Sequence, residues 1–171
     1  MSDERSAAGT GSTGAAGVES EGAVEARSAA CGGPAVPVLD RSRILRHDGA
    51  GWVGVRALPY REPVEGGAVA FRGITRRVLA APAAAAFDVR YFEIDPDGHS
   101  ALERHAHVHV VVCYRGRGRV RLGDALHDVG YGDVIYVAPD EPHQFLNPHT
   151  EPFGFLRIVD RERDRPEPIG G

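Results

Sequence analysis

Four of the eight histidines in this chain fall within eleven residues, and they form its clearest candidate for chemistry. They are His99, His105, His107 and His109, and Glu103 precedes the last three at the same two-residue alternation. On an extended strand, residues 103, 105, 107 and 109 would point to one face. Burying several ionisable side chains together is costly unless each has a partner. A metal ion is a partner that imidazoles and a carboxylate can share, so the spacing predicts a metal site.

Strand geometry sets a condition on this site. On a straight strand, residues 105 and 109 would lie roughly 13 Å apart, whereas metal ions bind nitrogen at about 2 Å. Both histidines can hold one ion only if the chain bends between them. The alternative is an exposed, histidine-rich strand without an ion. The histidines expected at the surface are His47, His99, His127 and His149.

Short apolar stretches broken by Gly, Pro and Asp must position these side chains. Turn residues such as Pro96-Asp97-Gly98 and Gly123-Asp124 separate them. Short strands at this spacing, without a long helical period, predict an all-β sandwich or barrel. The expected strands are Trp52–Ala57, Ala68–Phe71, Thr75–Ala80, Phe87–Ile94, His107–Tyr114, Arg119–Leu122, Ala125–Val129, Asp133–Val137 and Phe153–Val159.

The first 33 residues have a different composition from the rest. They contain 8 Ala, 7 Gly and 5 Ser and no aromatic residue. Such a segment cannot bury enough apolar surface to offset the entropy lost on ordering. We therefore predict a disordered tail over residues 1–33, followed by one folded domain.

Charge and composition exclude several classes of function. A formal net charge of −4 lacks the basic footprint of a nucleic-acid-binding protein. No run of about 18 apolar residues predicts a membrane span. The N-terminus shows no secretion signal, and Cys31 and Cys113 make no disulfide framework, so we expect a cytoplasmic protein. Cys113 is expected to be a small buried core residue.

Two stretches of the chain resemble the motifs of the cupin superfamily. The stretch from Pro96 to His109, ending at Gly116, is similar to the first motif: Gly, five residues, His-x-His, three or four residues, Glu, six residues, Gly. The stretch from Gly132 to Asn147 is similar to the second motif, and the two occur in the family's order. The resemblance implies a double-stranded β-helix, a jelly-roll barrel that holds one divalent metal ion. In the family the first motif spans two strands and a turn, which supplies the required bend.

The resemblance also divides the chain. It implies a barrel over residues 85–160, after strands at 34–84 that pack on the barrel or on a dimer partner. Residues 161–171 are predicted to form a charged C-terminal tail. A homodimer is implied because cupins commonly dimerise.

Two alignments with the first motif remain open. Counting back from Gly116 gives the metal ligands Glu103, His105, His109 and, from the second motif, His143. The family's three histidines and one glutamate are all present, with two positions exchanged. The competing alignment takes His105 and His107 as His-x-His, and leaves a valine (Val111 or Val112) in the carboxylate position. His107 is otherwise expected at the pocket rim, where it would contact substrate.

The second motif departs from the family at two positions. Ala138 replaces its proline and Asp140 replaces its glycine. Aspartate tolerates positive φ better than most residues, so the turn is expected to survive. Asn147 is expected to have a structural role in the following turn.

Three imidazoles and one carboxylate suit Mn, Fe, Ni, Cu or Zn. The resemblance is to small manganese-type cupins with His at the usual Glu position, which favours Mn or Fe. Glu103 could also act as a catalytic base. Arg157 and Phe155 are expected to bind substrate from the last strand, where Arg157 could clamp a carboxylate or a phenolate.

The function implied is that of a small-molecule oxidoreductase, in particular a metal-dependent dioxygenase. Lyase and isomerase chemistry also occurs among cupins. A non-catalytic metal- or ligand-binding protein on the same barrel is the alternative of a different class.

Overall fold

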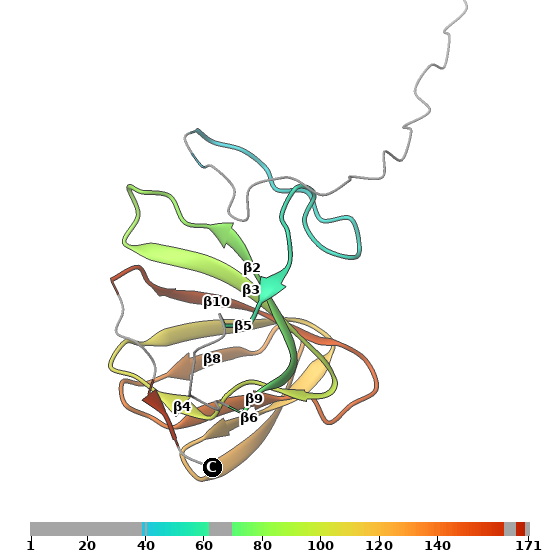
Figure 1. Cartoon of the computed structure of the whole chain (residues 1–171), viewed down its shortest axis with the longest axis vertical. Coiled ribbons are helices and arrows are strands. Elements are labelled where there is room, and N and C mark those ends of the chain that lie inside the picture. Colours follow the sequence, from blue (N-terminus) through green and yellow to red (C-terminus); the bar gives the residue numbers. More distant parts are fainter. Residues whose placement is uncertain (1–38, 40, 62–69, 163–166, 170–171) are drawn as a thin grey trace, which may run out of the picture. The chain divides into compact units, whose positions relative to one another are not determined.

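The computed structural model describes residues 39, 41–61, 70–162 and 167–169, all within one compact unit that spans residues 32–171. The described residues form strands and no helix, so the all-β prediction is confirmed (Figure 1). The predicted tail at 1–33 lies outside the described residues. In the part described, no helix is long and apolar enough to cross a membrane. The strands are β1 (Leu58–Pro59), β2 (Arg72–Ala80), β3 (Phe87–His99), β4 (Glu103–Arg104), β5 (His109–Arg115), β6 (Arg117–Leu122), β7 (Ala125–Gly130), β8 (Val134–Val137), β9 (His143–Leu146), β10 (Phe153–Asp160) and β11 (Glu167–Pro168).

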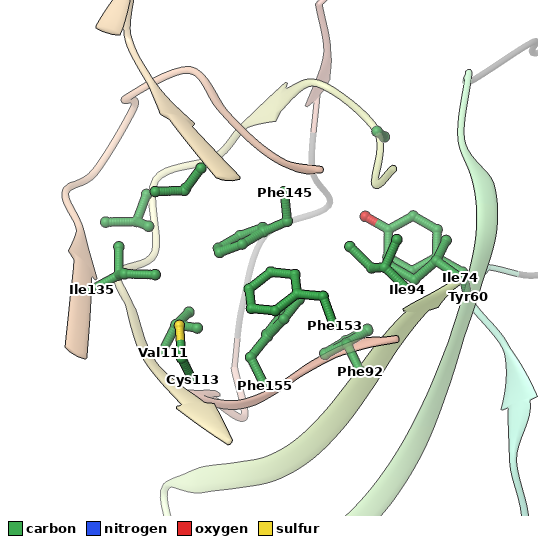
Figure 2. Packing of buried hydrophobic residues seen from close by; sticks show 13 residues of the cluster. Tyr60, Ile74, Phe92, Ile94, Val111, Cys113, Ile135, Phe145, Phe153 and Phe155 are labelled. Atoms are coloured by element: carbon green, nitrogen blue, oxygen red, sulfur yellow. The ribbon is translucent and has the colours of Figure 1, made fainter. Parts of the chain in front are cut away.

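The strands pair antiparallel into one sheet that curls around a core. One side runs β2–β3–β10–β5–β8, and the other runs β4–β9–β6–β7. The long β3 joins the two sides, because its last residue, His99, pairs with Leu146 of β9. Figure 2 shows the core between the two sides, with Phe145, Phe153 and Phe155 near its middle.

Alternation of buried and less buried residues along β5 and β9 links the core to the candidate site. On β5, Val111 and Cys113 are buried, and His109 shares their face. On β9, His143 points the same way as buried Phe145. Because side chains two residues apart share a face of a strand, the apolar positions of the core carry the histidines inward with them. Cys113 is a buried core residue, as expected.

One predicted turn is a bulge inside a strand. The Pro96-Asp97-Gly98 sequence lies within β3, where the register against β2 shifts between Arg72 and Ile74. Asp97 has φ of 58°, and a Cβ added to Gly98 would overlap the backbone oxygen atoms of Arg72 in β2 and Asp95 in β3. The turn residues therefore serve to bend the strand without ending it.

The second-motif turn survives its substitutions, as predicted. Asp140 adopts φ of 60°, and its backbone N–H donates to the carbonyl of His105 at 2.8 Å. The Asn147 side chain, which is 1% exposed, donates to the carbonyls of Ile94 and Glu151. Asn147 thereby has the structural role expected of it, and the Asp140 turn ties the second motif to the histidine cluster.

Residues before β2 lie on both faces of this sheet. Val55 packs with Leu79 and Tyr91 in an outer cluster, whereas Tyr60 belongs to the inner core. The Tyr60 ring packs edge-on against Phe92 at 6.0 Å between centroids. The next residue, Arg61, consequently lies beside the candidate site.

The close packing of Gly118 against Phe153 allows a test of the core. A Cβ added to this β6 residue would overlap the ring of Phe153, whereas one added to Gly130 of β7 would have no neighbour within 4 Å. Overpacking a core typically costs about 1–3 kcal/mol. We expect Gly118→Ala to lower the free energy of unfolding in urea by that amount. Gly130→Ala is the matched control and should leave it almost unchanged; equal effects would contradict this packing.

Candidate metal centre

The side chains of the predicted site converge at one end of the core. Glu103 lies on β4, His109 begins β5 and His143 begins β9, while His105 and His107 lie between β4 and β5. Glu103 pairs directly with His143 in the β4–β9 ladder. The exposed fractions of these five residues lie between 0% and 7%. The cluster is therefore buried, and the exposed-strand alternative is wrong.

The chain bends between His105 and His109, as the geometry required. Residues 105–108 leave the strand conformation between β4 and β5. The bend brings the His105 and His109 rings to 4.1 Å between centroids, in place of the separation expected on a straight strand. Both histidines can therefore reach a common ion.

Nitrogen and oxygen donors lie at metal-binding separations. The ligand atoms of Glu103, His105 and His143 lie within 4.8 Å of one another, and so do those of His105, His107 and His109. The Nε2 atoms of His107 and His109 are 3.0 Å apart. Two nitrogens bound at right angles, each about 2.1 Å from one ion, would lie about 3.0 Å apart.

Hydrogen bonds to backbone carbonyls orient two of the imidazoles. The Nδ1 of His105 donates to the carbonyl of His107 at 2.8 Å, and the Nδ1 of His143 donates to the carbonyl of Glu141 at 2.9 Å. Because a carbonyl only accepts, each Nδ1 carries the proton and each Nε2 keeps its lone pair. This arrangement is the usual support of metal-bound histidines.

A buried nitrogen atom without a hydrogen-bond partner indicates that the site fits a metal ion. His143 Nε2 is buried without a hydrogen-bond partner among the described residues. Burial lowers the pKa of His143 to about 4, with the charge of Arg157 adding to the effect. Burial, followed by Arg157, also lowers the pKa of His109. These imidazoles are neutral at pH 7, and a buried lone pair without a partner is costly. A divalent ion would satisfy it.

A pocket opens beside the cluster, and two predicted substrate-binding residues line it. Glu103, His143, Phe155 and Arg157 are among its lining residues. His107, predicted at the rim, does not line this pocket. It stacks on His105 inside the cluster, with 3.7 Å between ring centroids.

Sequence reasoning missed Arg61. Its guanidinium forms an ion pair with Glu103, although 42 positions separate the two residues in the chain. Tyr60 and Ser100 line the pocket and were likewise not anticipated as site residues. No motif or alternation marks Tyr60 and Arg61, because their positions depend on how residues before β2 pack against the barrel. Ser100 lies within the first motif, directly after β3.

Paired alanine substitutions distinguish the two alignments. If Glu103 is a ligand, we expect Glu103→Ala to weaken metal binding more than His107→Ala, because it removes the only negative charge among the five donors. Equilibrium dialysis with Mn²⁺ measures both. The reverse order would support the alignment based on His105 and His107.

Comparison with known proteins agrees with the fold. Residues 90–159 match the model of the cupin domain. The chain belongs to the cupin superfamily.

One curated relative has a named activity. The chain is 41% identical over 116 residues to a 1-methylthio-D-xylulose 5-phosphate methylsulfurylase from Rhodospirillum rubrum, covering 68% of this chain and 72% of the relative.

Solved structures support the same fold. A cupin 2 conserved barrel domain protein from Rhodopseudomonas palustris has 37% identity and a TM-score of 0.67, over 75% of this chain and 87% of its own. A cupin-2 domain from Rhodospirillum rubrum has 37% identity and a TM-score of 0.65, over 76% and 85%. A polyketide cyclase from Streptomyces resistomycificus has 25% identity and a TM-score of 0.64, over 76% and 86%.

Proposed function

We propose that this chain is a metal-dependent enzyme that cleaves the carbon–sulfur bond of a small methylthio ketose phosphate. The observation that carries the proposal is the buried donor cluster beside a pocket, in a chain 41% identical to a relative named for such a substrate.

The chemistry of that substrate class fits the donors. In a 1-methylthio 2-ketose, the sulfur-bearing carbon lies next to the carbonyl carbon. A divalent ion held by the cluster would polarise substrate oxygen atoms as a Lewis acid. His105, His109 and His143, with Glu103, would hold that ion. Glu103 borders the pocket, where its carboxylate oxygens can also take up or release a proton.

The reaction requires a thiol as the co-reactant. The thiolate attacks the substrate sulfur and forms an S–S bond while the bond from sulfur to carbon 1 breaks. The electron pair of that bond moves into the neighbouring carbonyl group, and carbon 1 then takes a proton. The products are a methyl disulfide and a 1-deoxy ketose phosphate, so atoms and electrons balance.

Proton NMR tests the proposal. The Mn²⁺-loaded protein is mixed with a 1-methylthio ketose phosphate and a small thiol. We expect the methylthio singlet to be replaced by singlets of the disulfide and of the new methyl ketone. His143→Ala is the control and should give neither signal. An unchanged spectrum with metal-loaded wild-type protein would contradict the proposal.

The dioxygenase function inferred from sequence uses the same metal centre and stays a prediction. Oxygen uptake with a panel of phenolic and keto-acid compounds is its test. The homodimer also stays a prediction.

A further inference from the structure

Two arginines converge on the single carboxylate of the metal centre. Arg61 forms an ion pair with Glu103, and Arg157 Nη1 lies 4.0 Å from the other carboxylate oxygen. The exposed fractions of the Arg61 and Arg157 side chains are 23% and 12%, against 3% for Glu103. Two positive charges thus face one negative charge in a site mostly shielded from water.

Each of the two guanidinium groups lies over an aromatic ring that lines the pocket. The Arg157 guanidinium lies over the ring of Phe92 at 5.7 Å, and that of Arg61 lies over Tyr60 at 5.3 Å. Burial lowers the pKa of Arg157 to about 10, and the charge of Arg61 contributes to the lowering. Arg157 is still charged at pH 7, so the two cations repel each other unless an anion lies between them.

A metal ion in the cluster and the Arg157 guanidinium would compete for the same nitrogen and oxygen atoms. Arg157 Nη2 contacts His109 Nε2 and lies 3.5 Å from His105 Nε2. A lone pair that binds a metal ion cannot also accept a hydrogen bond from a guanidinium. Glu103 likewise is a candidate metal ligand and the ion-pair partner of both arginines. An ion bound by the cluster would therefore break the contacts of Arg157 with His105, His109 and Glu103.

We propose that Arg61 and Arg157 form the binding site for the phosphate group of the substrate, and that metal binding makes this site available by drawing Glu103 away from them. Two cations match the two negative charges of a phosphate monoester better than the single charge of a carboxylate. Glu103 is the anion that both guanidinium groups face in this structure. That the phosphate belongs to a ketose phosphate rests on the proposed function.

Thermodynamic linkage between metal binding and phosphate binding allows the proposal to be tested without an activity assay. If metal binding makes the anion site available, phosphate must tighten metal binding by the same factor. Couplings between sites are typically about 5- to 150-fold, so we expect inorganic phosphate to lower the Kd for Mn²⁺ by about tenfold.

The experiment measures free Mn²⁺ by electron paramagnetic resonance during titration of the full chain. Titrations are run in millimolar phosphate, acetate or chloride at equal ionic strength. We expect tightening by phosphate and little effect of acetate. Arg61→Gln and Arg157→Gln should each remove the phosphate effect. Arg119→Gln changes an exposed arginine paired with Asp128 and is the control that should keep it.

The other possible outcomes contradict the phosphate site, the metal centre or both. Phosphate tightening that persists in Arg61→Gln would mean that phosphate binds the ion alone. Equal tightening by acetate would contradict a dianion site. Stoichiometric Mn²⁺ binding without any phosphate effect would overturn this inference and leave the proposed function standing. Absence of Mn²⁺ binding would overturn both. Thermal melting confirms that each variant is folded, and the more exposed Arg61 keeps the test valid if Arg157→Gln fails to fold.

Discussion

Replacing His143 with alanine is expected to abolish stoichiometric metal binding. Its Nε2 is buried, holds a free lone pair and has no hydrogen-bond partner in the described part of the chain. Removing only a hydrogen-bond partner of a metal ligand typically costs about 10- to 100-fold in affinity. Loss of the ligand itself should therefore cost at least about 100-fold.

Elemental analysis of purified variants checks this result. His105→Ala should also abolish stoichiometric metal binding. The Nδ1 of His105 donates to a backbone carbonyl, as that of His143 does, so the lone pair is on Nε2. His127→Ala is the control, since His127 is an exposed residue of β7. Metal retained in full by both His105→Ala and His143→Ala would contradict the assigned centre.

The second large effect is expected from Phe153→Ala. Phe153 is 0% exposed, and its ring packs against Phe155 at 5.4 Å between centroids. Truncating a buried phenylalanine typically costs about 3–5 kcal/mol. The melting temperature should therefore fall by roughly 10 °C or more.

Two comparisons show whether the loss comes from the core. Phe87→Ala removes a ring that is 47% exposed and should lower the melting temperature much less. The cost of Gly118→Ala should disappear in the Phe153→Ala background, because the ring that the new Cβ would overlap is gone. Additive costs in the double variant would contradict the contact.

Alternation and spacing predicted most of the strands and most of the site. The expected strand Trp52–Ala57 is wrong, because Trp52 makes only an isolated bridge with His47, and β9 was not predicted. On β5 and β9, apolar residues share a face with His109 and His143, so local sequence shows that these histidines point inward. The distance between residues 105 and 109 required a bend, and the structure has one. Asp140 at positive φ follows from the tolerance of aspartate for that conformation.

Other features depend on contacts that local sequence does not encode. His107 lies where the chain leaves the strand conformation, so alternation cannot predict its direction. Arg61 reaches Glu103 because Tyr60 packs on Phe92 of β3, a contact between distant parts of the chain. Within the segment predicted to be a charged tail, residues 167–168 form β11 and pair with β4 beside Glu103.

The central claim is that the buried cluster of Glu103, His105, His107, His109 and His143 holds one transition-metal ion. Elemental analysis of untagged protein purified without chelators tests it most directly. We predict about one equivalent of Mn, Fe, Ni, Cu or Zn per chain, removable by a chelator and restored by adding the ion back. Protein that contains no metal and gains none on reconstitution would contradict the claim.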